Sequence, residues 1–275
     1  MADQDTQASE PAQGGSPDPA ELFPFPLDDF QLEAIDALNQ GHSVVVSAPT
    51  GSGKTLVGEY AIHRAMAHGQ KVFYTTPLKA LSNQKLRDFR EQFGAENVGL
   101  MTGDLSVNRD ASIVVMTTEI FRNMLYAEAD EHDDPLADVE AVVLDECHYM
   151  NDSQRGTVWE ESIIHSPPPV QLVALSATVA NAGQLTDWIE KVHGPTRLVL
   201  SDFRPVPLHF GFCSAKGLHP LLNEQGTGLH PNCKVWRAPK GHKRKGRSPR
   251  PPQPEPPPIS FVVAQMAERD MLPAI

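Results

Sequence analysis

A lysine and a threonine follow two closely spaced glycines in the segment 48–55, APTGSGKT. Gly51 and Gly53 allow the tight turn that brings backbone N–H groups together around an anion. The ammonium of Lys54 suits the outer phosphates of a nucleotide, and the hydroxyl of Thr55 suits Mg²⁺. We therefore predict a phosphate-binding loop in which Lys54 is exposed. The predicted nucleotide-contacting residues of this loop are Thr50, Gly51, Ser52, Gly53, Lys54 and Thr55.

The segments on either side of the loop fit this chemistry. Residues 44–46 are a β-branched run typical of a strand buried on both faces, and residues 56–61 continue as an amphipathic helix. The unpaired N–H groups and the positive dipole end of such a helix converge on the turn. The full phosphate-loop pattern has a glycine where this chain has Ala48, so a glycine-rich loop without a phosphate ligand is the alternative. The order of strand, loop and helix favours phosphate binding.

Two adjacent carboxylates, Asp145 and Glu146, follow a second apolar run over 141–144. In a nucleotide hydrolase the first can hold Mg²⁺, directly or through water, and the second can orient and deprotonate the attacking water. Either acid alone could be a helix-cap residue. Because a G-K-T loop precedes them by about ninety residues, we favour hydrolysis. The predicted catalytic residues are Lys54, Asp145 and Glu146, with Thr55 and Asp145 as Mg²⁺ ligands.

Short apolar strands alternate with helical patterns along the chain. Strands are expected over 71–75, 98–101, 113–116, 141–144 and 171–175, and helices over 83–93, 119–125 and 184–192. This alternation predicts an α/β fold, a mostly parallel sheet with helices on both faces. Ligands of such sheets bind beyond the carboxyl ends of the strands. Ser176 and Thr178 follow the last of these strands and could link the carboxylates to a part that moves on hydrolysis.

An aromatic segment, FPFPLDDFQ at 23–31, lies upstream of the loop. A ring such as that of Phe25 can stack on a base, and the amide of Gln31 can read the edge of the base. The alternative is a hydrophobic staple on a core helix capped by Asp28 or Asp29. The residues alone leave both interpretations open.

Charge is unevenly distributed around a net value of −12. Eight of the 23 Lys and Arg residues lie in 234–250, which has no Asp or Glu, and the rest of the chain carries 15 basic against 35 acidic residues. This excludes a wholly basic protein that coats nucleic acid, but not a local basic arm. Three cysteines without a C-x-x-C pair indicate a reducing compartment, for which we expect the cytoplasm. The lack of an 18-residue apolar run argues against a membrane partner.

Seven motifs occur in a fixed order: FPLDDFQ, APTGSGKT, TTPLKALSNQK, TGDLSVN, VVMTTEIFRNML, LDECHYMND and SAT. As an ordered set over about 23–208 they resemble the motor domain of superfamily-2 helicases. More narrowly, they resemble the DExH-box RNA helicases of the superkiller and exosome-cofactor group. The resemblance implies a RecA-like P-loop NTPase domain that uses ATP and Mg²⁺ to move along or unwind RNA.

The resemblance also implies individual roles. Phe25 and Gln31 would contact adenine, Lys54 and Thr55 the phosphates and Mg²⁺, Asp145 the metal and Glu146 the water, while Ser176 and Thr178 would couple nucleotide state to domain closure. Short hydroxyl and N–H donors after three of the strands would line a single nucleic-acid strand, since such donors suit phosphate and sugar contacts. Any one of these threonines could equally be a strand-end or cap residue. The predicted nucleic-acid positions are Pro77, Lys79, Thr102, Gly103, Asp104, Thr117 and Thr118.

Four regions are expected along the chain. They are a disordered acidic tail over 1–21, the RecA-like domain over 22–210, a basic and proline-rich linker or insertion over 211–259, and the start of a second RecA-like domain over 260–275. The helicases of this group have a complete second domain whose arginine-rich motif finishes the ATP site, and no such motif is found here. We therefore expect a fragment whose partners are single-stranded RNA and that second domain.

Several alternatives remain open at this point. The chain could be a nucleotide-binding module that hydrolyses little by itself, or part of a DNA-directed helicase of the same superfamily. Its basic segment could be a plain linker or could touch nucleic-acid phosphates. Four residues, Cys213, His219, His230 and Cys233, could ligate zinc, but their spacing is unfamiliar and ordinary loop residues are the alternative.

Overall fold

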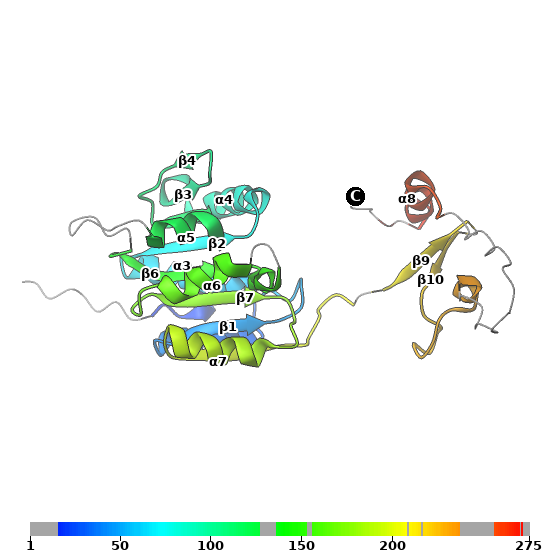
Figure 1. The fold of residues 1–275 in the computed structure, drawn as a ribbon, viewed down its shortest axis with the longest axis horizontal. Coiled ribbons are helices and arrows are strands. Elements are labelled where there is room, and N and C mark those ends of the chain that lie inside the picture. The colour runs from blue at the N-terminus through cyan, green and yellow to red at the C-terminus, as the bar shows by residue number, and fades with distance from the viewer. Residues whose placement is uncertain are drawn as a thin grey trace, which may run out of the picture. The chain divides into compact units, whose positions relative to one another are not determined.

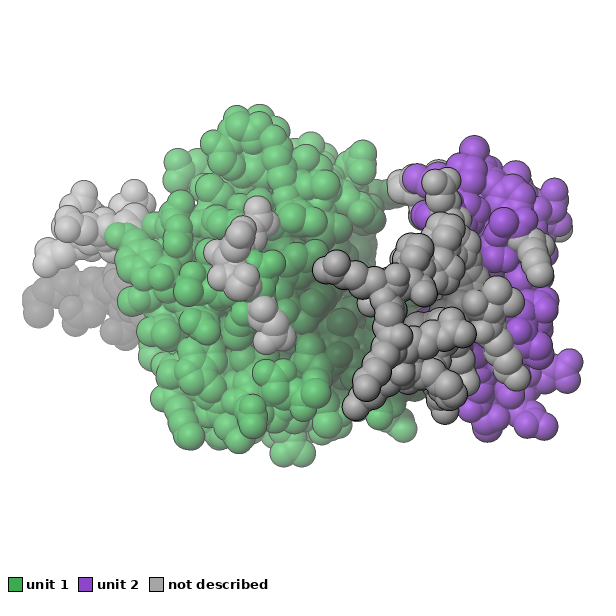
Figure 2. Space-filling model, turned by 45° about the vertical axis from the view of Figure 1, so that its right-hand side comes forward, with its two compact units in different colours: residues 1–205 green, residues 206–275 purple. Residues whose placement is uncertain are grey.

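The chain divides into two compact units, residues 1–205 and residues 206–275, which Figure 2 distinguishes by colour. A computed structural model of the chain describes residues 16–126, 136–152, 156–207, 209–215, 217–236, 256–269 and 271. The predicted basic arm within 240–250 and most of the predicted acidic tail lie outside these residues. None of the described helices is long and apolar enough to cross a membrane.

The first unit is built on one eight-stranded sheet with the order β4-β3-β5-β2-β6-β7-β1-β8 (Figure 1). All neighbouring strands are parallel except β3 and β4, which are antiparallel. The predicted mostly parallel α/β sheet is therefore confirmed. The strands are β1 Ser43–Ser47, β2 Lys71–Thr76, β3 Val98–Met101, β4 Ser106–Val107, β5 Ile113–Thr117, β6 Val139–Leu144, β7 Gln171–Ser176 and β8 Thr196–Leu200.

Helices cover both faces of this sheet (Figure 1). Val44 and Val46 belong to one core cluster with residues of α2, α3 and α4, whereas Val45 belongs to a second cluster with residues of α5, α6 and α7. This alternation follows from the two-residue period of a strand. The helices are α1 Pro19–Leu22, α2 Asp29–Asn39, α3 Thr55–Ala67, α4 Lys79–Phe93, α5 Thr118–Tyr126, α6 Gly156–His165 and α7 Ala182–Val192, with 3₁₀ turns at Ala95–Asn97 and Cys147–Asn151.

The second unit contains a short antiparallel hairpin of β9 Gly211–Ser214 and β10 Gly217–Pro220, a 3₁₀ turn over Pro231–Trp236 and helix α8 Ile259–Ala267. The hairpin was not expected in a region interpreted as linker. Helix α8 begins one residue before 260–275, the region expected to start a second domain, and none of its residues is buried. No group of three His, Cys, Asp or Glu side chains among the described residues is placed to hold a metal ion.

Candidate nucleotide and nucleic-acid site

The phosphate-binding loop lies between β1 and α3, as the sequence predicts. Gly51 and Gly53 adopt φ values of +81° and +84°, in the left-handed region that favours glycine. A Cβ atom on Gly53 would lie 2.8 Å from Nε2 of Gln31, which donates a hydrogen bond to the Gly53 carbonyl at 3.0 Å. Helix α2 is thus packed directly against the loop, and no side chain fits between them.

Lys54 is buried, with only 6% of its surface exposed, so the expectation of an exposed lysine was wrong. Lys54 lines a cavity of about 150 Å³ together with Thr55, Asp145 and Glu146. Its ammonium has no hydrogen-bond or ion-pair partner among the described residues. The side chain is buried, but its ammonium nitrogen is not among the buried polar atoms of the described residues, so it opens onto the cavity. The loop therefore holds a cation ready for an anion that comes from outside the chain.

Asp145 follows β6 and has both carboxylate oxygens occupied by donors. The Tyr74 hydroxyl donates to Oδ2 at 2.8 Å, and the backbone N–H of Glu146 donates to Oδ1 at 2.9 Å. The Asp145 N–H itself donates to the carbonyl of Thr75 on β2 at 3.0 Å. Burial, and then the neighbouring Asp145 carboxylate, raises the pKa of Tyr74 well above its usual value, so the phenol remains a donor.

Glu146 has a left-handed backbone, with φ +53° and ψ +42°. Among the described residues other than glycine, only Asn108 shares a positive φ. Such a conformation costs about 1–3 kcal/mol and is concentrated at functional sites. The Oε2 atom of Glu146 is buried, makes no hydrogen bond of good geometry and lies 3.2 Å from Nδ1 of His148. The fold thus holds this carboxylate at the cavity at some expense in stability.

His148 connects Glu146 to the segment that follows β7. The N–H of Ala177 points to Nδ1 of His148 at 3.4 Å, and the Ala177 carbonyl accepts from the Ser176 hydroxyl at 2.8 Å. Nδ1 can accept from Ala177 or donate to Glu146, but a single nitrogen cannot do both at once. His148 received no role from the sequence, although it lies two residues after Glu146. Thr178, which was predicted to couple with Ser176, is exposed.

The two predicted adenine contacts are placed differently. The side chain of Gln31 is buried, and its Oε1 accepts from the N–H of Asp28 at 2.9 Å while its Nε2 bonds to Gly53. Phe25 is half exposed, and its ring centroid lies 6.2 Å from that of Phe23. Gln31 therefore joins a helix cap to the phosphate-binding loop, whereas the ring of Phe25 is accessible to a base.

The family model described as DEAD/DEAH box helicase matches residues 28–185, and this range holds the loop and both carboxylates. The chain belongs to the DEAD/DEAH box helicase family. It is 55% identical over 211 residues to the chloroplastic DExH-box ATP-dependent RNA helicase DExH15 of Arabidopsis thaliana, covering 76% of this chain and 18% of that protein. It is 45% identical over 279 residues to the probable helicase HelY of Mycobacterium leprae, covering 93% of this chain and 29% of that protein. It is 48% identical over 217 residues to the antiviral helicase SKI2 of Saccharomyces cerevisiae, covering 78% of this chain and 17% of that protein.

These relatives confirm the predicted likeness to the superkiller group of DExH helicases. The chain spans less than a third of the length of the curated relatives named here. Among solved structures it is similar to the DUF1998 helicase MrfA bound to DNA, with a TM-score of 0.53 and 22% identity over 64% of this chain and 27% of that one. Identity at that level shows the shared fold alone.

The predicted nucleic-acid residues of this helicase domain lie at the carboxyl ends of three adjacent strands, β3, β5 and β2. Lys79 forms an ion pair with Asp104, which also accepts from the Thr102 hydroxyl at 3.1 Å. These two donors, Lys79 first, lower the pKa of Asp104. Thr118 has no exposed surface, and its hydroxyl donates to the carbonyl of Thr76 at 3.2 Å. The remaining predicted positions, Pro77, Gly103 and Thr117, belong to the same edge.

The pair of Lys79 and Asp104 gives a test of this edge. If the Lys79 ammonium contacts a phosphate, Lys79→Ala should weaken binding of single-stranded RNA and reduce the salt slope by about 0.7. Asp104→Asn should strengthen binding if Asp104 only competes for Lys79, and weaken it if Asp104 accepts from a sugar hydroxyl. Lys191→Ala, at an exposed position on α7, is the control. Fluorescence anisotropy at several salt concentrations measures the slope, and equal slopes in all proteins would exclude Lys79 from the interface.

Arg204 also reaches the loop, since its Nη1 donates to the carbonyl of Thr50 at 3.2 Å. Its side chain is half-buried, and it binds the backbone of the loop and not the cavity. Arg204 therefore ties the end of the first unit to the nucleotide loop.

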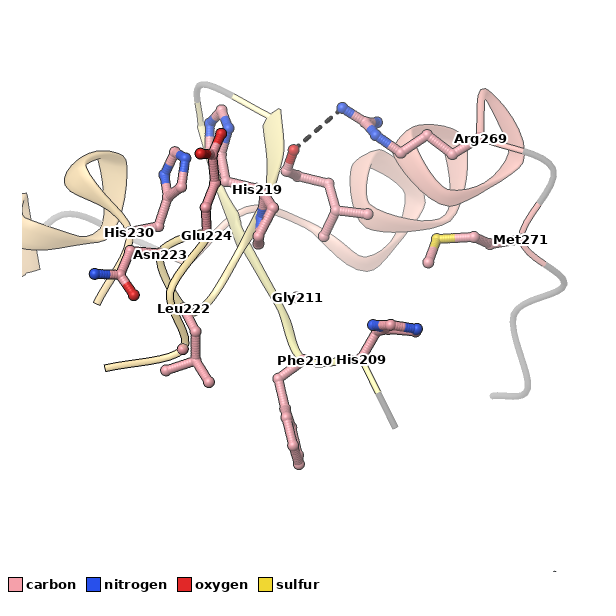
Figure 3. Close-up of a pocket in the computed structure, with 13 residues that line it drawn as sticks. His209, Phe210, Gly211, His219, Leu222, Asn223, Glu224, His230, Arg269 and Met271 are labelled. Atoms are coloured by element: carbon pink, nitrogen blue, oxygen red, sulfur yellow. Dashed lines mark hydrogen bonds between the residues drawn. The ribbon is translucent and has the colours of Figure 1, made fainter. Parts of the chain in front are cut away.

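A larger cavity, of about 580 Å³, lies in the second unit (Figure 3). The rings of His219 and His230 stack at its side with centroids 6.1 Å apart, and Arg269 donates to the carbonyl of Leu218 at 3.1 Å. Glu224 is the only carboxylate among its described lining residues, and these include no phosphate-binding loop. Size alone does not indicate a reaction site. The smaller cavity is the candidate, because Lys54, Thr55 and the two carboxylates converge on it.

Proposed function

We propose that this chain is the ATP-binding motor domain of an ATP-dependent RNA helicase and that it works with a second RecA-like domain. One observation carries the proposal: Lys54, Thr55, Asp145 and Glu146 line a single cavity at the carboxyl edge of the sheet. Each of these groups has a role in phosphoryl transfer to water.

In this proposal the loop binds the phosphates of ATP through its N–H groups, and the ammonium of Lys54 faces the outer phosphates. The hydroxyl of Thr55 and the carboxylate of Asp145 would hold Mg²⁺, because this hard cation prefers oxygen ligands. When bound, Mg²⁺ neutralises charge that develops on the phosphoryl oxygens. The buried hydroxyl of Ser52, which has no hydrogen-bond partner among the described residues, fits the same polar occupant.

Glu146 would orient the attacking water and take its proton. Through His148, any change at this carboxylate reaches Ala177 and Ser176, at the end of the strand next to β6. We infer that this short path lets the domain respond to hydrolysis and close against, or open from, the second domain. Thr178 is exposed where such a partner could contact it.

RNA is the proposed substrate because the DExH15 relative is named an ATP-dependent RNA helicase and because the ordered motifs resemble the superkiller group of RNA helicases. DNA is the alternative, and both would use sequence-independent contacts at the edge formed by β3, β5 and β2. We further propose a reducing, cytoplasmic setting, in keeping with the three free thiols. Comparing ATP turnover with RNA and with DNA, in a protein that includes the second domain, separates the two substrates.

The test of the nucleotide site is the affinity for ATP and Mg²⁺ of the Lys54→Ala variant. Loss of a hydrogen bond to a charged group is worth about 1.5–3 kcal/mol, so affinity should fall by roughly 10- to 150-fold. The melting temperature without nucleotide should change little, because the ammonium has no hydrogen-bond or ion-pair partner among the described residues to lose. Lys71→Ala, at the start of β2, is the control. Equal affinity of Lys54→Ala and the parent protein in calorimetric titration would exclude the loop as the nucleotide site.

A further inference from the structure

Tyr74 lies on β2, beside the strand that carries the Asp145 carboxylate. It pairs with Val143 of β6 in the parallel ladder, and its hydroxyl reaches Oδ2 of Asp145, 71 residues further along the chain. The side chain is completely buried in the core between the sheet and the layer of α2, α3 and α4. The sequence indicated only an apolar strand at this position.

The two donors to Asp145 differ in whether they can fix its carboxylate relative to the sheet. The N–H of Glu146 belongs to the next residue, so it moves together with Asp145 and cannot anchor the carboxylate to the sheet. Tyr74 stands on a different strand and is the one side-chain donor to Asp145 among the described residues. The orientation of the carboxylate relative to the loop therefore depends on this hydroxyl.

The ring of Tyr74 is itself closely held. Phe89 packs against it edge to face, with centroids 5.0 Å apart and an interplanar angle of 76°, and the Lys85 ammonium lies 5.4 Å from its centre. On the side of α3, a Cβ atom on Gly58 would come within 3.3 Å of the ring. Lys85 also lines the cavity that contains Lys54 and Asp145. A ring confined by two helices can fix the position of its hydroxyl closely.

We propose that Tyr74 is a positioning residue that aims the carboxylate of Asp145 at the metal ion of the bound nucleotide. Tyr74 acts through Asp145 and does not touch the nucleotide. The hydrogen bond leaves a second lone pair on Oδ2 and limits rotation of the carboxylate. This inference rests on the proposed function, because it assigns Asp145 to the metal. Partners of this kind typically change metal affinity by 10–100-fold when they are removed.

The experiment measures binding of a fluorescent ATP analogue to the 275-residue chain, first in EDTA and then across a Mg²⁺ titration. Tyr74→Phe removes only the hydroxyl, so affinity in EDTA should not change, whereas the Mg²⁺ concentration at half-effect should rise by about 10–100-fold. Tyr60→Phe is the matched control, because Tyr60 is equally buried and its hydroxyl donates to Asn39 at 2.8 Å, away from Asp145. It should leave both quantities unchanged.

Asp145→Asn separates failure of this inference from failure of the proposed function. If Asp145→Asn loses the Mg²⁺ dependence and Tyr74→Phe keeps it, the function stands and the role of Tyr74 is overturned. An equal shift in Tyr74→Phe and Tyr60→Phe also overturns it, because any buried hydroxyl would then have the same effect. If the parent chain shows no Mg²⁺-dependent nucleotide binding, the proposed function itself fails.

A second variant covers the case in which Tyr74→Phe does not fold. Gly58→Ala keeps the hydroxyl but places a methyl group 3.3 Å from the ring and the same distance from Val143. The ring must then shift by a few tenths of an ångström, while alanine favours the helix. A smaller rise in the Mg²⁺ requirement is expected. An unchanged requirement in a folded Gly58→Ala protein, with its ring displaced, would overturn the inference.

Discussion

Replacing Glu146 with Gln is expected to reduce ATP turnover by about 10²- to 10⁴-fold, the usual contribution of a general base, in a protein that joins this chain to a second RecA-like domain. The amide keeps the shape of the side chain but cannot take a proton from water. Binding of ATP should persist, because Lys54 and the loop N–H groups are unchanged. Steady-state kinetics and calorimetric titration of the same protein measure the two quantities.

The backbone of Glu146 should not affect the comparison of Glu146→Gln with the parent protein. A left-handed backbone costs glutamine and glutamate the same free energy, so the melting temperature should be the same in both proteins. Glu160→Gln, at an exposed position on α6, is the matched control and should turn over ATP normally. An unchanged kcat in Glu146→Gln would mean that this carboxylate is structural, and that its 3.2 Å approach to His148 has no part in hydrolysis.

The fold could be predicted from the sequence because its inner strands consist mostly of apolar and β-branched residues. The segment 141–144 is buried throughout, and any such run in an α/β chain must lie inside a covered sheet. Strand β8 was not predicted, since Val199 is the only buried residue in Thr196–Leu200 and an edge strand lacks a continuous apolar signal. Helix α4 begins at Lys79, four residues before the predicted start, in a segment of low hydrophobicity.

The site could be predicted only where its chemistry is local. The loop and the carboxylate pair are contiguous motifs, and the strand-end rule brings them together. Tyr74 and His148 could not be assigned, because their contacts depend on the register of β2 and β7 against β6 and not on their neighbours in sequence. The burial of Lys54 was missed for the same reason, since α4 and the two residues after β6 supply much of the cavity around it.

Residues 1–275 alone are expected to bind ATP and to hydrolyse it at close to the background rate, with or without RNA. Charge on the transferred phosphoryl group needs a cation placed at the transition state, and an arginine in that place is worth about 10³- to 10⁵-fold in rate. Lys54 and Mg²⁺ can bind the phosphates of ATP in the ground state. Arg204 binds the Thr50 carbonyl, and Lys85 lines the cavity but has its ammonium over the ring of Tyr74, so neither of these two cations is aimed at the reacting group.

Turnover of the purified chain, compared with that of a longer protein containing the second domain, tests this expectation. RNA-stimulated turnover should appear only in the longer protein, because closure of the second domain would bring its arginines to the γ-phosphoryl group. Glu146→Gln in both proteins reports any contaminating ATPase. Turnover of several per second by the chain alone would contradict the two-domain mechanism. Loss of that turnover in Arg204→Ala would then identify Arg204 as the cation and place the complete reaction within the first unit.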